Sequence, residues 1–320
     1  MVPYMHLDAK DYAILRELDC NFRQSFSSIG KKIRLSKNSV ALRFDKLQQY
    51  FLHNVTGINY GILNYTLVKV YYDLNVFDST TQQKIIREFS KHPSMIYVAH
   101  LYGTYDLVIA LLVSNFDDLV TSLTSFNAQF TELTNHHEIQ IIYEENYFRH
   151  NFLYLKPFHT KYTVARSLKK IALNNSEKQI LKLIRRNPRI PLTELAQHAQ
   201  LSIKTVRNKL SSLEKNKVIT GYFLTLNLKA FGYSTFKLMI RVHSLVDSKA
   251  FETFLLQHPH VRYMAKMLGY WNYEIDFIYE TINDLQEQIE IIKERFPNII
   301  KNLDIISFGE RIATNNERFL

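Results

Sequence analysis

Residues 35–47 read LSKNSVALRFDKL, and residues 201–213 read LSIKTVRNKLSSL. In both stretches a Leu-Ser pair precedes apolar residues spaced three and four apart, which places them on one face of a helix. The same offset of 166 residues relates landmarks throughout the chain, for example Gly103 and Gly269. Solenoid repeats have periods of about 20 to 50 residues, so an offset this long indicates a duplicated unit of several elements. The two halves of the chain are therefore compared throughout.

The composition indicates a soluble globular protein with more than one domain. The chain has 320 residues, of which 46% are hydrophobic and 22% charged, a balance that favours packed cores over disorder. No apolar run approaches the roughly 20 residues of a membrane helix, and residues 1–8 lack a signal-peptide core. We expect a cytoplasmic protein that makes no membrane contact. Cys20 is the single cysteine, which excludes an intrachain disulfide and favours a small core residue.

Positive charge alternates along the chain in blocks. Residues 1–62 carry nine basic and five acidic side chains, and residues 173–228 carry ten and three, for net charges of +4 and +7. Residues 63–145 have a net charge of −6 and residues 229–320 one of −1. A polyanion such as DNA would therefore contact the first part of each repeat.

The first part of each repeat is predicted to be a winged helix-turn-helix, over residues 1–62 and 173–228. Asp8 and Asn174 precede a first helix, a short second helix follows, and a third begins after the Leu-Ser turn. Residues 53–62 and 218–226 each surround a glycine and indicate a small β wing. In this motif the helix after the turn enters the major groove of DNA.

Candidate DNA contacts lie at the N-cap and on the outward face of each third helix. Arg and Asn side chains make bidentate contacts to bases, whereas Ser, Thr and Lys more often contact phosphates. The candidates are Ser36, Lys37, Asn38, Ser39, Arg43 and Lys46 in the first copy, and Ser202, Lys204, Thr205, Arg207, Asn208 and Lys209 in the second. An ordinary exposed helix face is the alternative, which two copies of the same arrangement disfavour.

The second part of each repeat is predicted to be a ferredoxin-like β-α-β-β-α-β domain, over residues 63–145 and 229–320. Apolar alternation predicts the strands, and apolar residues three and four apart predict the helices. Helices cover one face of such a sheet, so the other face needs a partner. The second copy in the same chain is the expected partner, which gives an α+β fold built as a tandem repeat.

This order of elements resembles the Lrp/AsnC family, the leucine-responsive or feast/famine regulators, in two fused copies. The landmarks are the Leu-Asp-x-x-Asp opening at residues 7–11, the two Leu-Ser turns, and the Gly-x-x-Asp turn at residues 103–106. The resemblance implies that the first domain binds DNA. It also implies that an amino acid or related effector binds near the Gly-x-x-Asp turn, between paired effector domains, and that the chain forms a homo-oligomer, such as a dimer.

The effector-binding candidates are Gly103, Tyr105 and Asp106 in the first copy, and Gly269, Trp271 and Asn272 in the second. Asn272 departs from the family aspartate, which puts effector binding by the second copy in doubt. Trp271, the only tryptophan, has a packing role as its simplest interpretation. Asp106 fits equally well as a turn residue bonded to its own backbone.

A segment rich in basic and aromatic residues, 146–172, links the copies with six basic side chains and no acidic one. A plain spacer would carry fewer aromatic residues. We expect the segment to pack along both halves. We also hypothesise that five of its cations lie near DNA phosphates: Lys156, Lys161, Arg166, Lys169 and Lys170.

The sequence favours a sequence-specific transcriptional regulator with two DNA-binding heads, and neither an enzyme nor a protein with a cofactor or metal. The alternative is a sirohaem decarboxylase, because fused Lrp-like proteins include such enzymes. Residues 269–273 do not keep the Trp-Pro-Tyr-Asn-like signature of those enzymes. Histidines that qualify only by type are His100, His136, His137, His243, His258 and His260. A third possibility is an effector-only sensor or a co-regulator that binds protein. Acidic or apolar outward faces on the helices after Ser36 and Ser202 would favour it, and neither helix has such a face.

Overall fold

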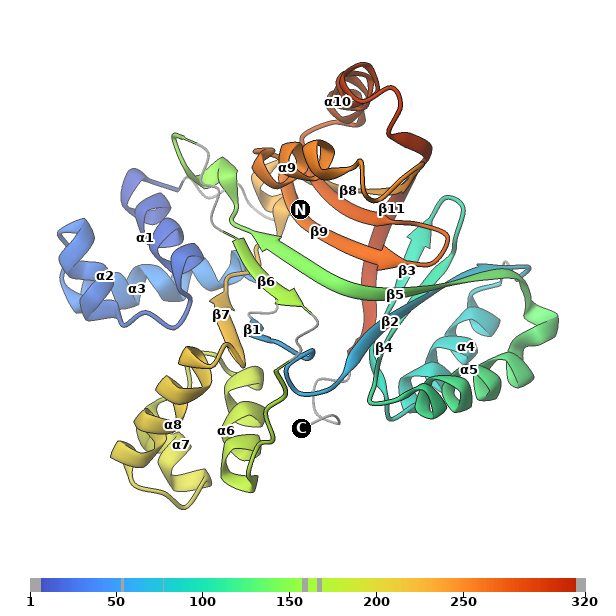
Figure 1. Cartoon of the computed structure of the whole chain (residues 1–320). Helices are drawn as coiled ribbons and strands as arrows, with labels where there is room; N and C mark the ends of the chain where they lie inside the picture. The colour runs from blue at the N-terminus through green and yellow to red at the C-terminus, as the bar shows by residue number, and fades with distance from the viewer. Residues whose placement is uncertain (1–6, 53–54, 77, 157–160, 166–168, 315–320) are drawn as a thin grey trace. The chain divides into compact units, whose positions relative to one another are not determined.

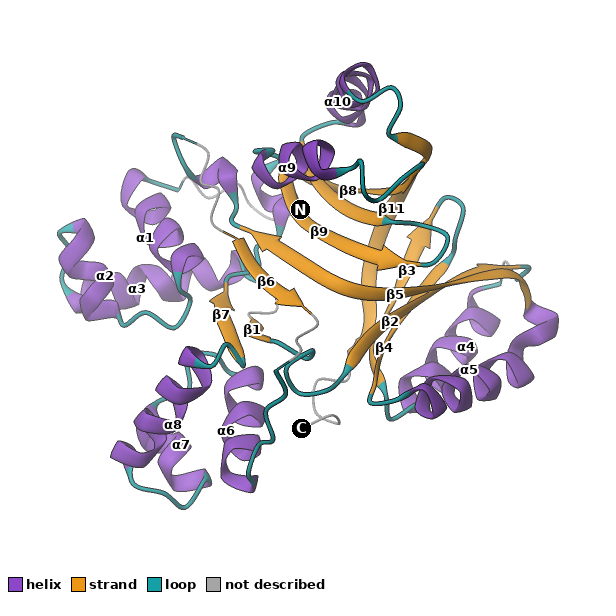
Figure 2. Ribbon diagram, in the orientation of Figure 1, coloured by secondary structure: helices purple, strands orange, loops and turns teal. Residues whose placement is uncertain are grey.

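The computed structural model describes residues 7–52, 55–76, 78–156, 161–165 and 169–314 (Figure 1). The chain divides into two compact units, and each combines segments of both copies. The helix-turn-helix unit contains residues 1–59, 148–162 and 173–234, and the barrel unit contains residues 60–147, 163–172 and 235–320. Figure 2 shows the helices of the first unit and the long strands of the second.

Three helices form the body of each helix-turn-helix domain, as predicted. They are α1 (Ala9–Cys20), α2 (Phe26–Ile33) and α3 (Lys37–Leu47) in the first copy, and α6 (Asn175–Arg186), α7 (Leu192–His198) and α8 (Ile203–Lys215) in the second. Asp8 and Asn174 both close capping boxes at the first helix of their copy. Short 3₁₀ helices follow at η1 (Gln48–Tyr50), η3 (Asn151–Leu153) and η4 (Leu228–Phe231). The predicted helix starts are confirmed because capping is decided by local sequence.

The predicted wings differ from the structure in their pairing. Each copy contributes one strand, β1 (Val55–Ile58) and β7 (Ile219–Phe223), and these two strands pair antiparallel with each other. Gly57 lies opposite Gly221 in this ribbon. The two sequence segments are therefore halves of one shared ribbon instead of two separate hairpins. A single strand must find its hydrogen-bond partner elsewhere, and here the other copy provides it.

The barrel unit contains the predicted β-α-β-β-α-β order twice. The first copy has β2 (Thr66–Leu74), α4 (Ser79–Lys91), β3 (Met95–Tyr102), β4 (Leu107–Val113), α5 (Phe116–Phe130), η2 (Thr131–Leu133) and β5 (Thr134–Phe148). The second has β8 (Ser234–Val242), α9 (Lys249–Gln257), β9 (Val261–Leu268), β10 (Tyr273–Tyr279), α10 (Ile282–Arg295) and β11 (Ile300–Thr314). The α+β tandem fold is thus confirmed.

The two copies form one closed sheet because the last strand of each crosses into the other. The strand order is β2-β4-β3-β11-β8-β10-β9-β5-β6, and a further pairing of β2 with β5 closes the ring. Residues 134–142 of β5 pair with β2, whereas residues 141–147 pair with β9 of the second copy. In the same way, β11 pairs with β8 and then with β3. The other copy is therefore the partner of each ferredoxin-like sheet, as expected.

Alternation along β2 separates two apolar clusters. Val68, Val70 and Tyr72 pack with the first copy's helix residues, Phe89 among them. Leu67 and Tyr71 point the other way, into a cluster that includes residues of both copies. Successive strand residues face opposite sides of a sheet. The second cluster is consequently the interface that fuses the copies.

The linker segment is more ordered than a spacer. Its strand β6 (Lys161–Ala165) lies beside β5, where Thr163 Oγ1 donates to Asn146 Oδ1 at 2.8 Å. In the barrel unit, Lys170 Nζ donates to the carbonyl oxygen of Gly61 at 2.8 Å. Lys156, Lys161 and Lys169 are exposed, and Arg166 lies outside the described residues. Their proposed proximity to phosphates stays a prediction.

Candidate DNA-binding and effector sites

Two of the predicted DNA contacts, Ser36 and Ser202, cap the recognition helices α3 and α8, and two more, Ser39 and Thr205, are their hydrogen-bond partners. Ser36 Oγ accepts from the backbone amide of Ser39 at 3.0 Å, and Ser202 Oγ accepts from that of Thr205 at 3.1 Å. The hydroxyl groups within each pair also lie 2.8 Å apart. These interactions begin each helix at the residue after the Leu-Ser turn.

Two predicted cations tie the recognition helix to the first helix of the same domain. Arg43 Nη1 lies 2.7 Å from carboxylate oxygens of both Asp8 and Asp11. At the same offset in the second copy, Lys209 Nζ lies 3.7 Å from a carboxylate oxygen of Glu177. Hydrogen bonds to Asp11 and Asp8 raise the pKa of Arg43 above its ordinary value. These two cations have acidic neighbours in the protein itself.

The remaining predicted contacts stay exposed on the outer faces of the recognition helices. They are Lys37, Asn38 and Lys46 on α3, and Lys204, Arg207 and Asn208 on α8. Val40 and Phe44 face inward on α3, as Val206 and Leu210 do on α8. Burial of the apolar face therefore directs the polar residues of each helix outward.

Reciprocal contacts hold the two heads together within the helix-turn-helix unit. Arg23 Nη1 donates to the carbonyl oxygen of Pro188 at 2.6 Å, and Arg189 Nη1 donates to those of Phe22 and of Gln24. Arg189 and Pro188 lie 166 residues after Arg23 and Phe22, so they are the equivalent positions of the second copy. The contacts therefore follow a pseudo-twofold relation. Burial lowers the pKa of Arg189 to about 10. Arg23 and Arg189 occupy equivalent positions of the two copies, but the sequence analysis assigned them no role.

A buried carboxylate anchors the linker to the first head. Asp19, which is 4% exposed, accepts from the backbone amide of His150 at 3.0 Å and from Tyr154 Oη at 3.0 Å. His150 Nδ1 also lies 2.7 Å from Asp19 Oδ1. The adjacent Cys20 is half-buried and its sulfur contacts the Arg149 guanidinium, so the prediction of a core cysteine is only partly met. Asp19 has an arginine at its equivalent position, Arg185, so this anchor belongs to the first copy alone.

The two Gly-x-x-Asp-type turns have the same geometry despite their different final residues. Asp106 Oδ2 accepts from the backbone amide of Leu74 at 2.8 Å, and Asn272 Oδ1 accepts from that of Val242 at 2.9 Å. The bond goes to a neighbouring strand, not to the residue's own backbone as the turn interpretation predicted. An asparagine supplies the same carbonyl-type acceptor as aspartate. The departure at Asn272 therefore leaves the turn intact.

The glycines and aromatic residues of these turns lie at the fusion interface of the barrel. Gly103 and Gly269 have φ values of +137° and +150°, which disfavour any side chain. Trp271 Nε1 donates to Tyr105 Oη at 3.1 Å, and both side chains are buried. These residues are related by the 166-residue offset and pack against each other. The packing role predicted for Trp271 is thus supported by its burial.

Gln140 makes the two turns unequal. Its fully buried carboxamide lies against the second turn, where it is oriented to accept from the amides of Tyr270 and Trp271 at 3.2 Å and to donate to the Trp271 carbonyl oxygen at 3.1 Å. The equivalent residue near the first turn is Ile306, which has no hydrogen-bonding side chain. Sequence reasoning missed this difference because the two residues are far from their turns along the chain.

An ion network without a sequence signature lies inside the barrel. Lys69 Nζ and Tyr71 Oη donate to Glu274 Oε2 at 2.6 and 2.7 Å, and Lys237 contacts the other oxygen of the same carboxylate. All four side chains are buried. Burial alone would raise the pKa of Glu274, but the two ammonium groups hold it at about 2. Lys237 also lies 2.5 Å from Asp276 Oδ1.

The histidines named for a porphyrin pocket lie on several elements, with His136 beside His137 and His258 beside His260. His136 pairs with Glu138 at 2.9 Å, His137 stacks on Tyr72, and His260 stacks on Tyr279. His258 is buried, which lowers its pKa to about 4. His100 lies on β3 and His243 is exposed after β8. Within the described residues no group of three His, Cys, Asp or Glu side chains is arranged to hold a metal ion.

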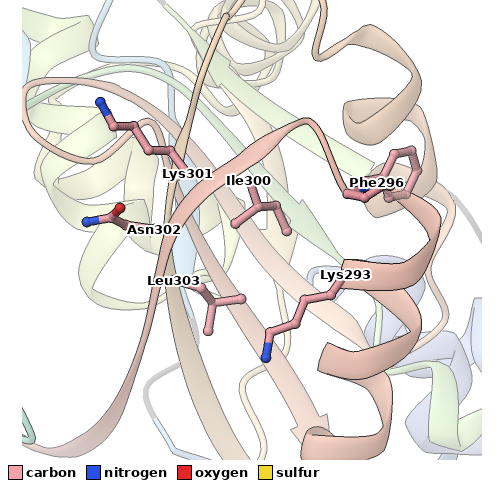
Figure 3. Close-up of a pocket in the computed structure, with 7 residues that line it drawn as sticks. Lys293, Phe296, Ile300, Lys301, Asn302 and Leu303 are labelled. Atoms are coloured by element: carbon pink, nitrogen blue, oxygen red, sulfur yellow. The ribbon is translucent and has the colours of Figure 1, made fainter.

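Each unit has a surface pocket, and no histidine lines either of these two pockets. The pocket in the barrel unit lies where α10 ends and β11 begins (Figure 3), lined by Lys293, Phe296, Pro297, Ile300, Lys301, Asn302 and Leu303. Figure 3 shows Lys293 and Phe296 on α10, and Ile300, Lys301, Asn302 and Leu303 on β11. The second pocket includes Cys20 and Tyr162. No helix of the described chain is long and apolar enough to cross a membrane.

Comparison with protein families identifies both helix-turn-helix domains. Residues 7–48 match the AsnC-type helix-turn-helix domain, and residues 173–220 match a winged helix-turn-helix DNA-binding family. The transcriptional regulator LrpA of Pyrococcus horikoshii is 34% identical over 62 residues, 19% of this chain and 44% of LrpA. An uncharacterized regulator of Pyrococcus abyssi is 24% identical over 120 residues, 35% of this chain and 77% of that protein. The chain therefore carries two Lrp/AsnC-type helix-turn-helix domains, but matches under half the length of LrpA.

The fold of nearly the whole chain also occurs in a solved structure. The siroheme decarboxylase NirDL superposes with a TM-score of 0.67 at 12% identity, covering 97% of this chain and 94% of NirDL. Its complex with an iron-uroporphyrin III analogue gives a TM-score of 0.63 over 95% of this chain and 92% of NirDL, also at 12% identity. At this identity the match shows a common fold.

Proposed function

We propose that this chain, with its two Lrp/AsnC-type helix-turn-helix domains, binds double-stranded DNA sequence-specifically and regulates transcription. The observation that carries the proposal is the exposed polar face of both recognition helices. Lys37 and Asn38 on α3, and Lys204, Arg207 and Asn208 on α8, remain outside the capping and ion-pair interactions of the domains. Residues of these types contact base edges and phosphates in the major groove.

Reciprocal arginine contacts support a two-headed binding mode. Arg23 and Arg189 each bond to backbone oxygens of the other head, and β1 pairs with β7. Two heads joined in this way bind DNA without the loss of rotational freedom that separate heads would incur. The bound site is consequently an imperfect inverted repeat.

Selection from a random duplex pool tests this function. The purified chain should enrich a pseudo-palindromic motif at physiological salt. Replacing Lys204 and Arg207 with alanine should weaken binding to that motif at least tenfold, since bidentate and charged contacts contribute about 1–3 kcal/mol each. The matched control is Lys84→Ala together with Arg87→Ala, an exposed pair on α4 of the barrel unit. The proposal fails if no motif is enriched.

Sirohaem decarboxylation is the second candidate function, favoured by the fold shared with NirDL over nearly the entire length of both chains. An iron tetrapyrrole substrate would need a cavity of matching size and a nearby acid or base. The test is incubation of the reduced, anaerobic protein with sirohaem. Loss of carboxylate groups in the product by mass spectrometry would support the enzyme.

The effector remains part of the proposal for the regulator. The resemblance implies an amino-acid effector near Gly103, Tyr105 and Asp106, but Tyr105 is buried against Trp271. An effector that binds at this turn would therefore have to displace aromatic packing. Tryptophan fluorescence during titration with each amino acid reports such displacement directly, because Trp271 is the only tryptophan.

A further inference from the structure

The outer faces of the two recognition helices carry the same three kinds of side chain in a different order. At the first, second and sixth helical positions α3 has Lys37, Asn38 and Leu42. At the same positions α8 has Ile203, Lys204 and Asn208. Each helix thus presents one lysine, one asparagine and one aliphatic residue. The second and sixth positions are four apart and lie side by side on a helix, with the first at its N-terminal tip.

All three positions are accessible on both helices, including the aliphatic ones. The exposed fraction of Leu42 is 62% and that of Ile203 is 42%. The apolar core of each domain uses other residues, such as Val40 and Val206, which are fully buried. Leu42 and Ile203 consequently do not serve the packing of their own helices.

We infer that Leu42 and Ile203 each contact the methyl group of a thymine, at different places in the two half-sites. This inference rests on the proposed DNA-binding function and adds two specificity-determining residues to it. N-terminal residues of a recognition helix reach base edges in the major groove. There lysine suits guanine, asparagine suits adenine, and an apolar side chain suits the thymine C5-methyl group.

The order of the side chains predicts the order of the contacts. On α8 the aliphatic residue is at the tip, followed by the lysine and then the asparagine one turn later. On α3 the lysine is at the tip and the aliphatic residue is one turn later. The thymine read by Ile203 and the one read by Leu42 therefore lie at non-equivalent positions of the inverted repeat. A perfectly symmetric site would satisfy one head and mismatch the other.

Deoxyuridine substitution provides the test, because deoxyuridine lacks only the methyl group of thymine. In the selected duplex, each thymine is replaced singly, and affinity is measured for the intact chain and for Ile203→Ala and Leu42→Ala. Loss of one buried methyl group should weaken binding about fourfold. We expect that loss at one thymine in each half-site, at non-equivalent positions. Ile203→Ala should abolish it in one half-site and Leu42→Ala in the other. Ile291→Ala, an exposed aliphatic residue on α10 of the barrel unit, is the matched control and should preserve both effects.

The outcomes separate this inference from the function on which it rests. If a motif is enriched but no thymine responds to deoxyuridine, or if both alanine variants keep the full response, the inference is wrong and the DNA-binding function stands. If no motif is enriched, both are wrong. Both alanine variants should fold normally, since their side chains lie at the surface.

Discussion

We expect Glu274 to be highly sensitive to substitution, because its one carboxylate contacts two buried ammonium groups. It lies 2.6 Å from Lys69 Nζ, contacts Lys237, and accepts from Tyr71 Oη. Glu274→Gln keeps the shape of the side chain but removes its charge. Removing one partner of a buried ion pair typically costs about 3–5 kcal/mol, since the remaining charge is left uncompensated. Asp276 still contacts Lys237, so Lys69 bears most of that cost.

The lowered pKa of Glu274 makes this stabilisation depend on pH. Its value of about 2 in the folded protein lies below the ordinary 4.5. Because the folded pKa is the lower one, the unfolded chain binds more protons between these values. The stabilisation is therefore complete above about pH 4.5 and is lost as pH falls toward 2.

Urea unfolding followed by the fluorescence of Trp271 is the appropriate assay, because this tryptophan is buried in the same unit. We expect Glu274→Gln to lower the free energy of unfolding by about 3–5 kcal/mol at pH 7. The triple variant Lys69→Met, Lys237→Met, Glu274→Leu should recover part of the loss, because apolar residues of similar volume can replace buried ion pairs. Recovery is incomplete because Glu145 and Asp276 lose their neighbouring cations. A loss under about 1 kcal/mol, or a triple variant no more stable than the single one, would refute the reasoning.

Three further predictions follow from single contacts. Asn272→Asp should leave the free energy of unfolding of the barrel nearly unchanged, whereas Asn272→Leu should lower it by about 1–3 kcal/mol, because the Val242 amide loses its acceptor; urea unfolding distinguishes them. Ser202→Ala should lower the stability of the helix-turn-helix unit by about 1 kcal/mol through loss of the α8 cap, measured by circular dichroism. His258 should stay neutral down to about pH 4 in an NMR titration. The free energy of unfolding should fall as pH drops from 6.5 to 4, because the unfolded chain then binds more protons than the folded one. Titration of His258 near its ordinary pKa of 6.5 would contradict this prediction.

The positions where the helices begin could be predicted from local sequence. Ser36 and Ser202 cap α3 and α8 as predicted, and Asp8 and Asn174 close the capping boxes. Capping involves groups within three residues of each other, so a short sequence window contains all the information. The strand order within each β-α-β-β-α-β copy was predictable for a similar reason, since apolar alternation depends on nearby residues.

The pairing of β1 with β7 and the buried ion network could not be predicted from local sequence. The segments around Gly57 and Gly221 have strand character, but the residues near each glycine do not indicate that the two segments pair with each other. Lys69, Lys237 and Glu274 are far apart along the chain and have the composition of ordinary surface residues. Their burial results from the crossing of β5 and β11 between the copies. Long-range pairing of this kind carries no short-range signal.

The sequence by itself determined that one unit occurs twice, where its helices begin, and which polar residues lie on the outer faces of α3 and α8. Capping, helical periodicity and strand alternation are local properties, so they can be predicted from neighbouring residues in the sequence. Only the tertiary structure decided that the copies share one β ribbon and one closed barrel. It also decided that Arg43 and Lys209 pair with acidic residues of the first helices, and that Asn272 accepts the same kind of backbone hydrogen bond as Asp106. Those facts depend on which distant groups meet, and burial in the folded chain determines whether each charge or amide finds a partner.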